Sequence, residues 1–527
     1  MCKAVSIGAG IGCGVFDVTH PSGMRAADPA GERESDGDVG RRAASGVLWL
    51  TMQKWATRLL GFVTIAVLTR LLSPEDFGTV AAASTVLPFF FLVADLGFAA
   101  YIVQVDRANR RMLSTAWWFS LVAGATLAGL LVAVAPLLGA AFRDERVVPV
   151  LQVLSLWVLL TAVGSVPMAI LRRKMLFKRL AAQGAIAAVV AQVVALSMAF
   201  SGFGVWALVG QSLVAPVVTT SLAWFSARWA PTRDFSAAEF RRMLAFGAKV
   251  LGVEFIAMLR AWAEAAVVSA VLGIVSLGYL SVAQRLVQVV QDLTGGAIIP
   301  VTTVAFARLR DDPERLRKAY LRALTTSYAA LSLPLTVIAV TAPMLIPIVF
   351  GPGWEASAQV AQLLALAATM TVAAALDHGL FYGLGRPGLW LIYAIIVDAL
   401  TLGVTVGTVS FGLTTVAMGF VAVCVLATIV RWFLTARVLG TRLSIVCRPF
   451  GYLIVAVFLS GSGGLLITAT TAAWNSFLVI VVAAAVIVIV HLGVTALMAP
   501  EVPRDVVTLV RRSSPWRRFT RRQPKES

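Results

Sequence analysis

The chain has 527 residues, of which 59% are apolar and 13% charged, and its mean hydropathy is +0.87. Ordinary soluble domains have about 45–50% apolar and about 25% charged residues, so the composition excludes a cytosolic enzyme, a secreted disulfide scaffold and a disordered chain. The apolar residues fall in continuous blocks rich in Ala, Leu and Val. Such blocks fit membrane-spanning helices of about 20 residues and not the short alternating strands of an outer-membrane barrel. The sequence therefore predicts an all-α polytopic membrane protein.

The charge balance is basic, with 44 Lys and Arg residues against 26 Asp and Glu residues and a net charge of +18. These cations form short runs between apolar blocks and no continuous basic domain, so we expect no nucleic-acid partner. The four cysteines, Cys2, Cys13, Cys424 and Cys447, have neither metal-binding nor disulfide spacing. We expect free thiols, no metal site and no cofactor.

Polar residues and Gly/Pro breaks divide the apolar sequence into fourteen predicted spans. They are residues 45–69, 78–103, 113–138, 148–170, 181–201, 205–226, 246–272, 277–304, 320–342, 358–383, 388–410, 414–436, 449–470 and 476–498. Residues 1–43 contain Gly, Asp and Arg without periodicity, which predicts a disordered cytoplasmic tail. Residues 501–527 are predicted to form a basic cytoplasmic tail with anionic membrane lipids as partners.

The arginines between spans alternate in number along the chain. If the N-terminus is cytoplasmic, the predicted outer loops hold only Arg70, Arg143 and Arg146, and the inner segments hold nearly all the others. Cytoplasmic loops of membrane proteins carry an excess of Lys and Arg. The sequence thus predicts a multi-pass protein of the inner (plasma) membrane with both termini in the cytoplasm.

An internal repeat emerges when the chain is compared with itself at an offset of about 200 residues. The matched positions include Leu72 with Leu272, Gly78 with Gly278 and Ala83 with Ala283. They predict two pseudo-symmetric six-helix lobes, residues 44–230 and 231–440, followed by two helices in residues 441–500. Duplicated halves are a common transporter plan, with the substrate site between the halves and alternating access by rocking.

Ionisable side chains inside spans are costly, at about 2.5–3.5 kcal/mol each at a helix centre, so each needs a partner or a water-filled cavity. The first span carries Lys54 and Arg58, and the seventh carries Lys249, Arg260 and Glu264. Cations on two equivalent helices predict a positively charged cavity and an anionic substrate. Two alternatives stay open: the lysines can extend to the headgroups, and Arg260 can form a structural ion pair with Glu264.

Other charged residues lie in later spans. Arg285 and Asp292 are seven residues apart in the eighth span and nearly eclipsed, while Asp377, beside His378, and Asp398 are lone carboxylates. A buried carboxylate can carry a coupling proton or coordinate sodium, although adjacent residues on a helix point about 100° apart. The predicted substrate-binding residues are Lys54, Arg58, Lys249, Arg260 and Arg285. The predicted coupling or gating residues are Glu264, Asp292, Asp377 and His378.

The sequence contains no P-loop and no HExxH or GxSxG motif. We therefore expect no enzymatic activity and no catalytic residue, and we expect transport to draw on an ion gradient or the membrane potential.

An ordered set of motifs resembles a known family. They are RLLSPEDFG at Arg70–Gly78, ADLG at Ala94–Gly97, LRRKMLFKRL at Leu171–Leu180, LGIVSLGY at Leu272–Tyr279, FARLRDDPERLR at Phe306–Arg317, FGPGW at Phe350–Trp354 and GLGRP at Gly383–Pro387. Over about residues 45–445 the chain resembles bacterial polysaccharide flippases of the Wzx and colanic-acid-exporter type, within the multidrug/oligosaccharidyl-lipid/polysaccharide exporter superfamily.

The resemblance implies a flippase that moves an undecaprenyl-pyrophosphate-linked oligosaccharide to the outer leaflet through a V-shaped cavity between two lobes. It also implies that Lys54, Arg58, Lys249 and Arg260 are candidates to hold the pyrophosphate. A glycan polymerase and glycosyltransferases are further expected partners. The alternatives are a multidrug or cation antiporter of the same superfamily, a peptidoglycan-precursor flippase, and a non-transporting scaffold for glycan assembly.

Overall fold

The computed structural model describes residues 36–105, 108–471 and 474–502. By its internal contacts the chain divides into residues 1–45 and 46–527, and the packing below is that of the second unit. Regular structure in the described residues is helical throughout, which confirms the predicted fold class. The predicted tails, residues 1–43 and 501–527, lie mostly outside the described residues, although α1 already begins at Asp36.

Fourteen long helices and one short helix follow one another along the described chain. They are α1 (Asp36–Leu71), α2 (Pro74–Asp95), α3 (Phe98–Gln104), α4 (Arg110–Phe142), α5 (Val147–Arg173), α6 (Phe177–Phe200), α7 (Val205–Ala227), α8 (Ala237–Leu272), α9 (Ile274–Arg308), α10 (Pro313–Phe350), α11 (Glu355–Gly383), α12 (Pro387–Thr408), α13 (Leu413–Val438), α14 (Leu443–Thr470) and α15 (Ser476–Met498). In this part of the chain, eleven helices are long and apolar enough to cross a membrane. The count of fourteen spans stays a prediction.

One predicted span is wrong at its end. Residues 78–103 were expected to form one helix, but α2 ends at Asp95 and the short α3 begins at Phe98. Between them Leu96 and Gly97 have φ angles of 46° and 71°. These left-handed residues break the α-helix, and an apolar sequence pattern alone does not reveal such a turn.

Local sequence sets where several helices begin. Pro74 occupies the first turn of α2, and the Ser73 side chain accepts a hydrogen bond from the Asp76 backbone N–H while the Asp76 carboxylate accepts one from that of Ser73. This capping box satisfies two N–H groups that a helix start leaves without partners. The side chains of Asn109 and Asp312 cap α4 and α10, each by accepting a hydrogen bond from a backbone N–H of the first turn.

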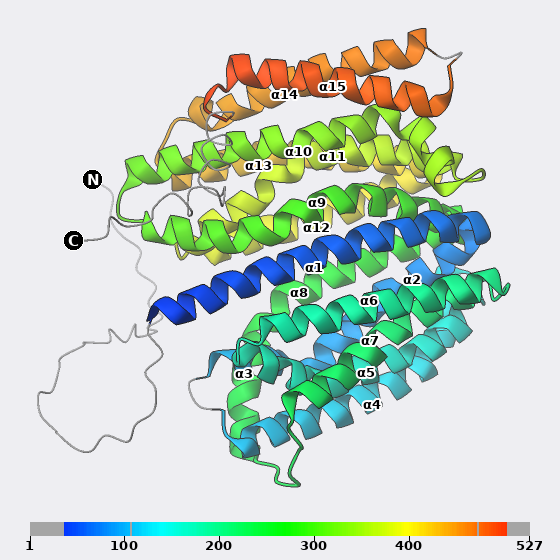
Figure 1. The fold of residues 1–527 in the computed structure, drawn as a ribbon, viewed down its shortest axis with the longest axis vertical. Helices are drawn as coiled ribbons and strands as arrows, with labels where there is room; N and C mark the ends of the chain where they lie inside the picture. The colour runs from blue at the N-terminus through cyan, green and yellow to red at the C-terminus, as the bar shows by residue number, and fades with distance from the viewer. Residues whose placement is uncertain (1–35, 106–107, 472–473, 503–527) are drawn as a thin grey trace, which may run out of the picture. The chain divides into compact units, whose positions relative to one another are not determined.

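The helices pack mainly within two groups. In the first half of the chain α5 contacts α2, α4 and α7, and α6 contacts α7; in the second half α11 contacts α9, α10 and α13. The last two helices, α14 and α15, lie side by side and both contact α10 (Figure 1). The groups meet where α2 contacts α8 and α9.

The predicted boundary between the halves, near residue 230, stays a prediction. The first turns of α8 pack on first-half helices: the Phe240 ring lies 5.9 Å from that of Phe98 and 5.1 Å from that of Phe119, and Met243 is in the same apolar cluster. The first turns of α8 therefore pack with the helices of the first half.

Two glycines bring α2 and α9 into direct backbone contact. A Cβ atom on Gly78 would collide with the carbonyl oxygen of Ile274, and one on Gly278 would collide with that of Pro74. The contact is reciprocal, and both pairs are related by the offset of the internal repeat. Such self-complementarity is what a two-fold relation between the two halves requires.

The same end of the bundle has two further contacts between the halves. The Trp354 indole N–H donates to the carbonyl oxygen of Thr69 over 2.9 Å, and the Ser269 hydroxyl donates to that of Phe142 over 2.7 Å. Trp354 is only 1% exposed, and its ring meets that of Phe77 edge-on at 5.2 Å. We call Thr69, Gly78, Phe142, Ser269, Gly278 and Trp354 the clasp.

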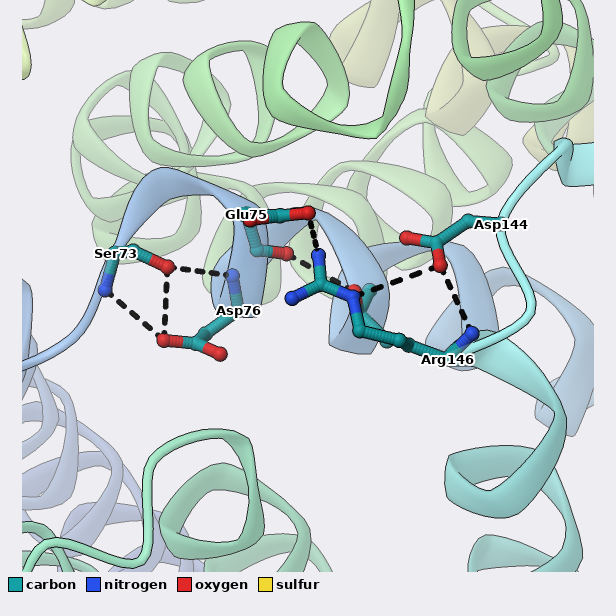
Figure 2. Close-up of polar contacts among 6 residues, drawn as sticks. Ser73, Glu75, Asp76, Asp144 and Arg146 are labelled. Atoms are coloured by element: carbon teal, nitrogen blue, oxygen red, sulfur yellow. Dashed lines mark hydrogen bonds and ion pairs between the residues drawn. The ribbon is translucent and has the colours of Figure 1, made fainter.

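The start of α2 is also tied to the turn between α4 and α5. Figure 2 shows Arg146 reaching from that turn to Glu75, with Asp144 on its other side. The Asp144 carboxylate accepts a hydrogen bond from the Arg146 backbone N–H over 2.8 Å. Together with the Ser73–Asp76 capping box, these contacts explain Ser73, Glu75 and Asp76 of the RLLSPEDFG motif as determinants of the start of α2.

We predict that Gly78→Ala and Gly278→Ala each destabilise the protein by about 1–3 kcal/mol, because the added methyl group meets backbone that has no rotamer to change. Thermal unfolding of purified protein in detergent measures the effect. Gly403→Ala on α12 is the matched control, since a Cβ atom there has no heavy atom within 4 Å. Equal melting temperatures for the three variants would contradict the proposed role of the glycine contact.

Candidate functional site

A cavity of about 670 Å³ lies among α2, α8, α9, α11, α12 and α13. Its charged lining residues are Arg260, Glu264, Arg285 and Asp398. Its uncharged polar lining residues are Ser84, Thr85, Ser281, Gln284, Gln288, Gln291, Thr371 and Thr401. Hydroxyl and amide groups of this kind both donate and accept hydrogen bonds, so the cavity suits a ligand with many hydroxyl groups and an ionic group.

Arg260 lies between two carboxylates. Its Nη1 atom is 2.6 Å from Glu264 Oε2, one turn further along α8, and its Nε atom is 2.8 Å from Asp398 Oδ1 on α12. The ion pair with Glu264 is the one that the sequence left open as an alternative. The second pair joins α8 to α12, so Arg260 is a charged brace between two helices of the cavity wall.

Arg285 is the second cation of the cavity wall, and it lies on α9 next to Gln284 and one turn from Gln288. Among the residues that the structure describes, no carboxylate lies within ion-pair distance of Arg285. Both described carboxylates of the cavity are held by Arg260. Among the described residues of this wall, Arg285 is therefore the cation whose charge is available to an anionic ligand.

The structure brings together three of the predicted site residues, Arg260, Glu264 and Arg285. Arg58 is exposed on α1 and is not among the residues that line the cavity. The side chains of Lys54, Lys249 and Asp292 lie outside the described residues. The predicted convergence of cations from the first and seventh spans thus stays a prediction.

Asp377 and His378 do not form the pair that the sequence suggested. The Asp377 carboxylate is 2.7 Å from Arg431 Nε on α13 and accepts hydrogen bonds from the hydroxyls of Tyr320, over 2.5 Å, and Thr435, over 3.2 Å. The His378 ring stacks on that of Tyr382, with centroids 4.1 Å apart. Adjacent helical residues point in different directions, and here they face different neighbours.

The Asp377 network is sealed inside the helix bundle and does not line the cavity. Asp377 is 1% exposed and Arg431 is 2% exposed. The Arg431 guanidinium also donates to the carbonyl oxygen of Met370 over 3.0 Å. A buried ion pair is tolerated when further hydrogen bonds satisfy its remaining polar atoms, and this network meets that condition across α10, α11 and α13.

Arg431 was not among the residues that we predicted from the sequence. The sequence does contain a signal for Arg431. A lone arginine in one span and a lone aspartate in another each cost free energy in the membrane, so the two are expected to pair. The same reasoning applies to Asp398, a lone carboxylate whose partner proves to be Arg260. In the described part of the chain, no three His, Cys, Asp or Glu side chains gather as metal ligands.

Several proteins of known role are similar to this chain. The succinoglycan biosynthesis transport protein ExoT of Rhizobium meliloti is 27% identical over 67% of this chain and 72% of its own length. The teichuronic acid biosynthesis protein TuaB of Bacillus subtilis is 23% identical over 78% of this chain and 87% of its own length. The lipopolysaccharide biosynthesis protein WzxC of Escherichia coli is 23% identical over 76% and 82%, respectively.

Solved transporter structures share the fold. The lipid II flippase MurJ, in an inward closed conformation, matches with a TM-score of 0.67 and 13% identity over 87% of this chain and 100% of its own. An inward-facing multidrug transporter of the MATE family matches with a TM-score of 0.60 and 19% identity over 74% and 95%. The chain thus has the fold of these polytopic transporters.

The model of a protein family described as polysaccharide biosynthesis protein matches residues 67–359. This segment is more than half of the chain and includes α2 through α10, with the clasp glycines and both arginines of the cavity. The chain is therefore a multi-pass membrane protein that belongs to the polysaccharide biosynthesis protein family.

Proposed function

We propose that this protein is a flippase that translocates an undecaprenyl-pyrophosphate-linked oligosaccharide across the inner membrane for cell-surface polysaccharide synthesis. The observation that carries the proposal is the cavity, where one arginine without a described counter-charge lies among amide and hydroxyl side chains. The amide and hydroxyl side chains can form hydrogen bonds with a glycan, and the cation can bind a pyrophosphate. The family membership and the names of the relatives agree with this substrate class.

Within this function, Arg285 binds the anionic group of the substrate. A guanidinium makes strong charge-assisted hydrogen bonds to phosphate oxygens, and these bonds are stronger where water is limited. Arg260 holds α8 against α12 because its charge is already engaged by Glu264 and Asp398. The two arginines thus have different roles in one cavity.

Alternating access requires that the contacts between the halves break and reform. The clasp is the set of contacts in question, because its hydrogen bonds join Trp354 to Thr69 and Ser269 to Phe142 across the halves. The clasp closes one end of the bundle. Opening toward that end separates α2 from α9 at Gly78 and Gly278, and the substrate then leaves to the outer leaflet.

The driving force is an ion gradient or the membrane potential, and one charge moved through 100 mV supplies about 2.3 kcal/mol. Glu264 and Asp398 are the described carboxylates that line the cavity, so we propose that ion coupling takes place there and not at Asp377 and His378. The clasp end faces outward and both termini are cytoplasmic. Anionic lipids, a glycan polymerase and glycosyltransferases are the proposed partners, and the protein catalyses no reaction.

The function is tested with purified protein in liposomes that contain a fluorescent lipid-linked oligosaccharide. We expect protein-dependent transfer between leaflets, measured as loss of fluorescence to an impermeant quencher, with an imposed gradient as the driving force. Lipid II and a cationic dye serve as competing substrates. Transfer of the dye or of lipid II in place of the oligosaccharide would contradict the proposed substrate.

We predict that Arg285→Gln lowers the flipping rate by at least about tenfold, which corresponds to about 1.4 kcal/mol of lost interaction with the anionic group. Arg285→Lys retains the charge without the planar fork and should keep partial activity. The same liposome assay at varied substrate density measures both. Arg285→Gln protein with the wild-type rate and the wild-type melting temperature would rule out the assigned role.

For the sealed network, we predict that Asp377→Asn destabilises the protein by about 3–5 kcal/mol, because it leaves the Arg431 charge buried without its partner. The double variant Asp377→Leu/Arg431→Met removes both charges and should recover most of the stability. Thermal unfolding measures the stabilities, and flipping under a pH gradient measures coupling. If Asp377→Asn is as stable as wild type but insensitive to the gradient, then Asp377 is a coupling residue and our assignment is wrong.

Reporter fusions test the proposed orientation. Fusions at Ser73 and Gly353 should report an outer location, and a fusion at Asp312 a cytoplasmic one, because this arrangement places the basic loops inside. The pattern of alkaline phosphatase and fluorescent-protein activity distinguishes the two sides. An outer location of Asp312 would overturn the topology.

A further inference from the structure

A group of exposed cations gathers at the end of the first half that lies opposite the clasp. They come from the start of α4, the end of α5, the turn into α6 and the start of α8. We call this group the basic rim, and its members are Arg110, Arg111, Arg172, Lys174, Lys178, Arg179, Arg241 and Arg242, all of them exposed.

Hydrogen bonds fix two of the elements that carry the basic rim, α4 and the segment leading into α8, relative to each other. The segment that joins α7 to α8 is held on α4, because the Thr232 backbone N–H donates to the Ser114 hydroxyl over 2.9 Å and that of Ser236 donates to Thr115 Oγ1 over 3.0 Å. The Trp118 indole donates to the Thr232 carbonyl oxygen over 2.8 Å. The rim therefore presents its charges on an ordered framework.

The charges of the basic rim are poorly neutralised by the protein. Within the described residues, its ion pair is that of Arg242 with Glu239, at 3.9 Å. The corresponding segment of the second half, before and within the start of α10, is different because its cations have acidic neighbours. Those pairs are Arg310 with Asp311, Arg315 with Asp312, and Arg317 and Lys318 with Glu314, at 3.7–3.9 Å.

Aromatic side chains lie just beside the basic rim. Phe225, near the end of α7, is 79% exposed, and Phe235 is 50% exposed. The rings of Trp117, Trp224 and Trp229 form a chain, with centroids 5.7 Å apart at each step. Trp and other aromatic residues gather at the membrane–water interface, so this composition places the rim at the level of lipid headgroups.

We propose that the basic rim is a binding surface for the headgroups of anionic phospholipids. A group of cations with one ion pair among the described residues, next to exposed aromatic rings, matches a phosphate group above an acyl chain. The segment at the start of α10 has a smaller surplus, because three carboxylates pair with its four cations, and under this proposal it does not bind these lipids preferentially. The proposal concerns bulk phospholipid and is independent of the substrate of transport.

Lipid retention by the purified full-length protein tests the proposal. Protein in mixed micelles of phosphatidylglycerol and phosphatidylcholine is analysed by native mass spectrometry, and the bound lipids are counted by class. The rim variant is Arg110→Gln, Arg111→Gln, Lys174→Gln and Lys178→Gln together. The matched control removes four cations from the other half: Arg310→Gln, Arg315→Gln, Arg317→Gln and Lys318→Gln.

We expect the rim variant to lose phosphatidylglycerol retention by at least about fivefold while phosphatidylcholine is unchanged. The control should retain phosphatidylglycerol like the wild type, and raised salt should weaken retention in the wild type and the control but not the residual retention of the rim variant. Unchanged retention in the rim variant, or equal loss in both variants, would overturn the proposal. If the variant with four substitutions unfolds, the double variant Lys174→Gln/Lys178→Gln, at the end of α5 and the start of α6, replaces it.

A competing source of phosphate is the transported lipid itself. Undecaprenyl pyrophosphate is therefore added to the same micelles as a competitor. Under our proposal it displaces little phosphatidylglycerol from the wild type at equal concentration. Complete displacement, together with a flipping defect of the rim variant, would show that the rim is an entry site for substrate and would refute a phospholipid site. A normal flipping rate in that variant supports the phospholipid site.

Discussion

The close approach of α2 and α9 is the constraint on which the arrangement of the helices depends. Gly78 and Gly278 allow backbone to contact backbone, and no larger residue fits at either position. Helices in lipid gain little from apolar burial against one another, so close packing at small residues supplies much of their attraction. The clasp residues Thr69 and Ser269, also related by the repeat, then add polar contacts on either side of this point.

Charge pairing divides the polar residues of the interior into two kinds. Asp377 and Arg431 form a buried ion pair that does not line the cavity. From this location we infer that the pair holds helices together. Arg260 satisfies two carboxylates at the cavity wall, where a ligand can compete with them. No described carboxylate lies within ion-pair distance of Arg285. Position relative to the cavity, more than residue type, decides which of these groups can act on a substrate.

Much of the fold was accessible from the sequence, since apolar blocks gave the helix positions and the repeat gave the equivalence of Gly78 and Gly278. The turn at Leu96 was not accessible, because an apolar pattern does not report a left-handed residue. For the site, the cost of lone charges pointed to Arg260, Glu264 and Arg285, which line one cavity, while their role toward a substrate stays a prediction. Asp377 was also selected by its cost, but adjacency in sequence suggested His378 as its neighbour, whereas helix packing places Arg431 beside its carboxylate.

The Asp377–Arg431 pair has a consequence for how the protein is made. Asp377 lies in α11 and Arg431 in α13, so the carboxylate is synthesised well before the arginine that satisfies it, with all of α12 between them. A lone charge is costly in a lipid environment. We therefore expect the helix that carries Asp377 to be fully stabilised in the bilayer only after α13 has been synthesised. The order of synthesis would then matter for the folding of the second half.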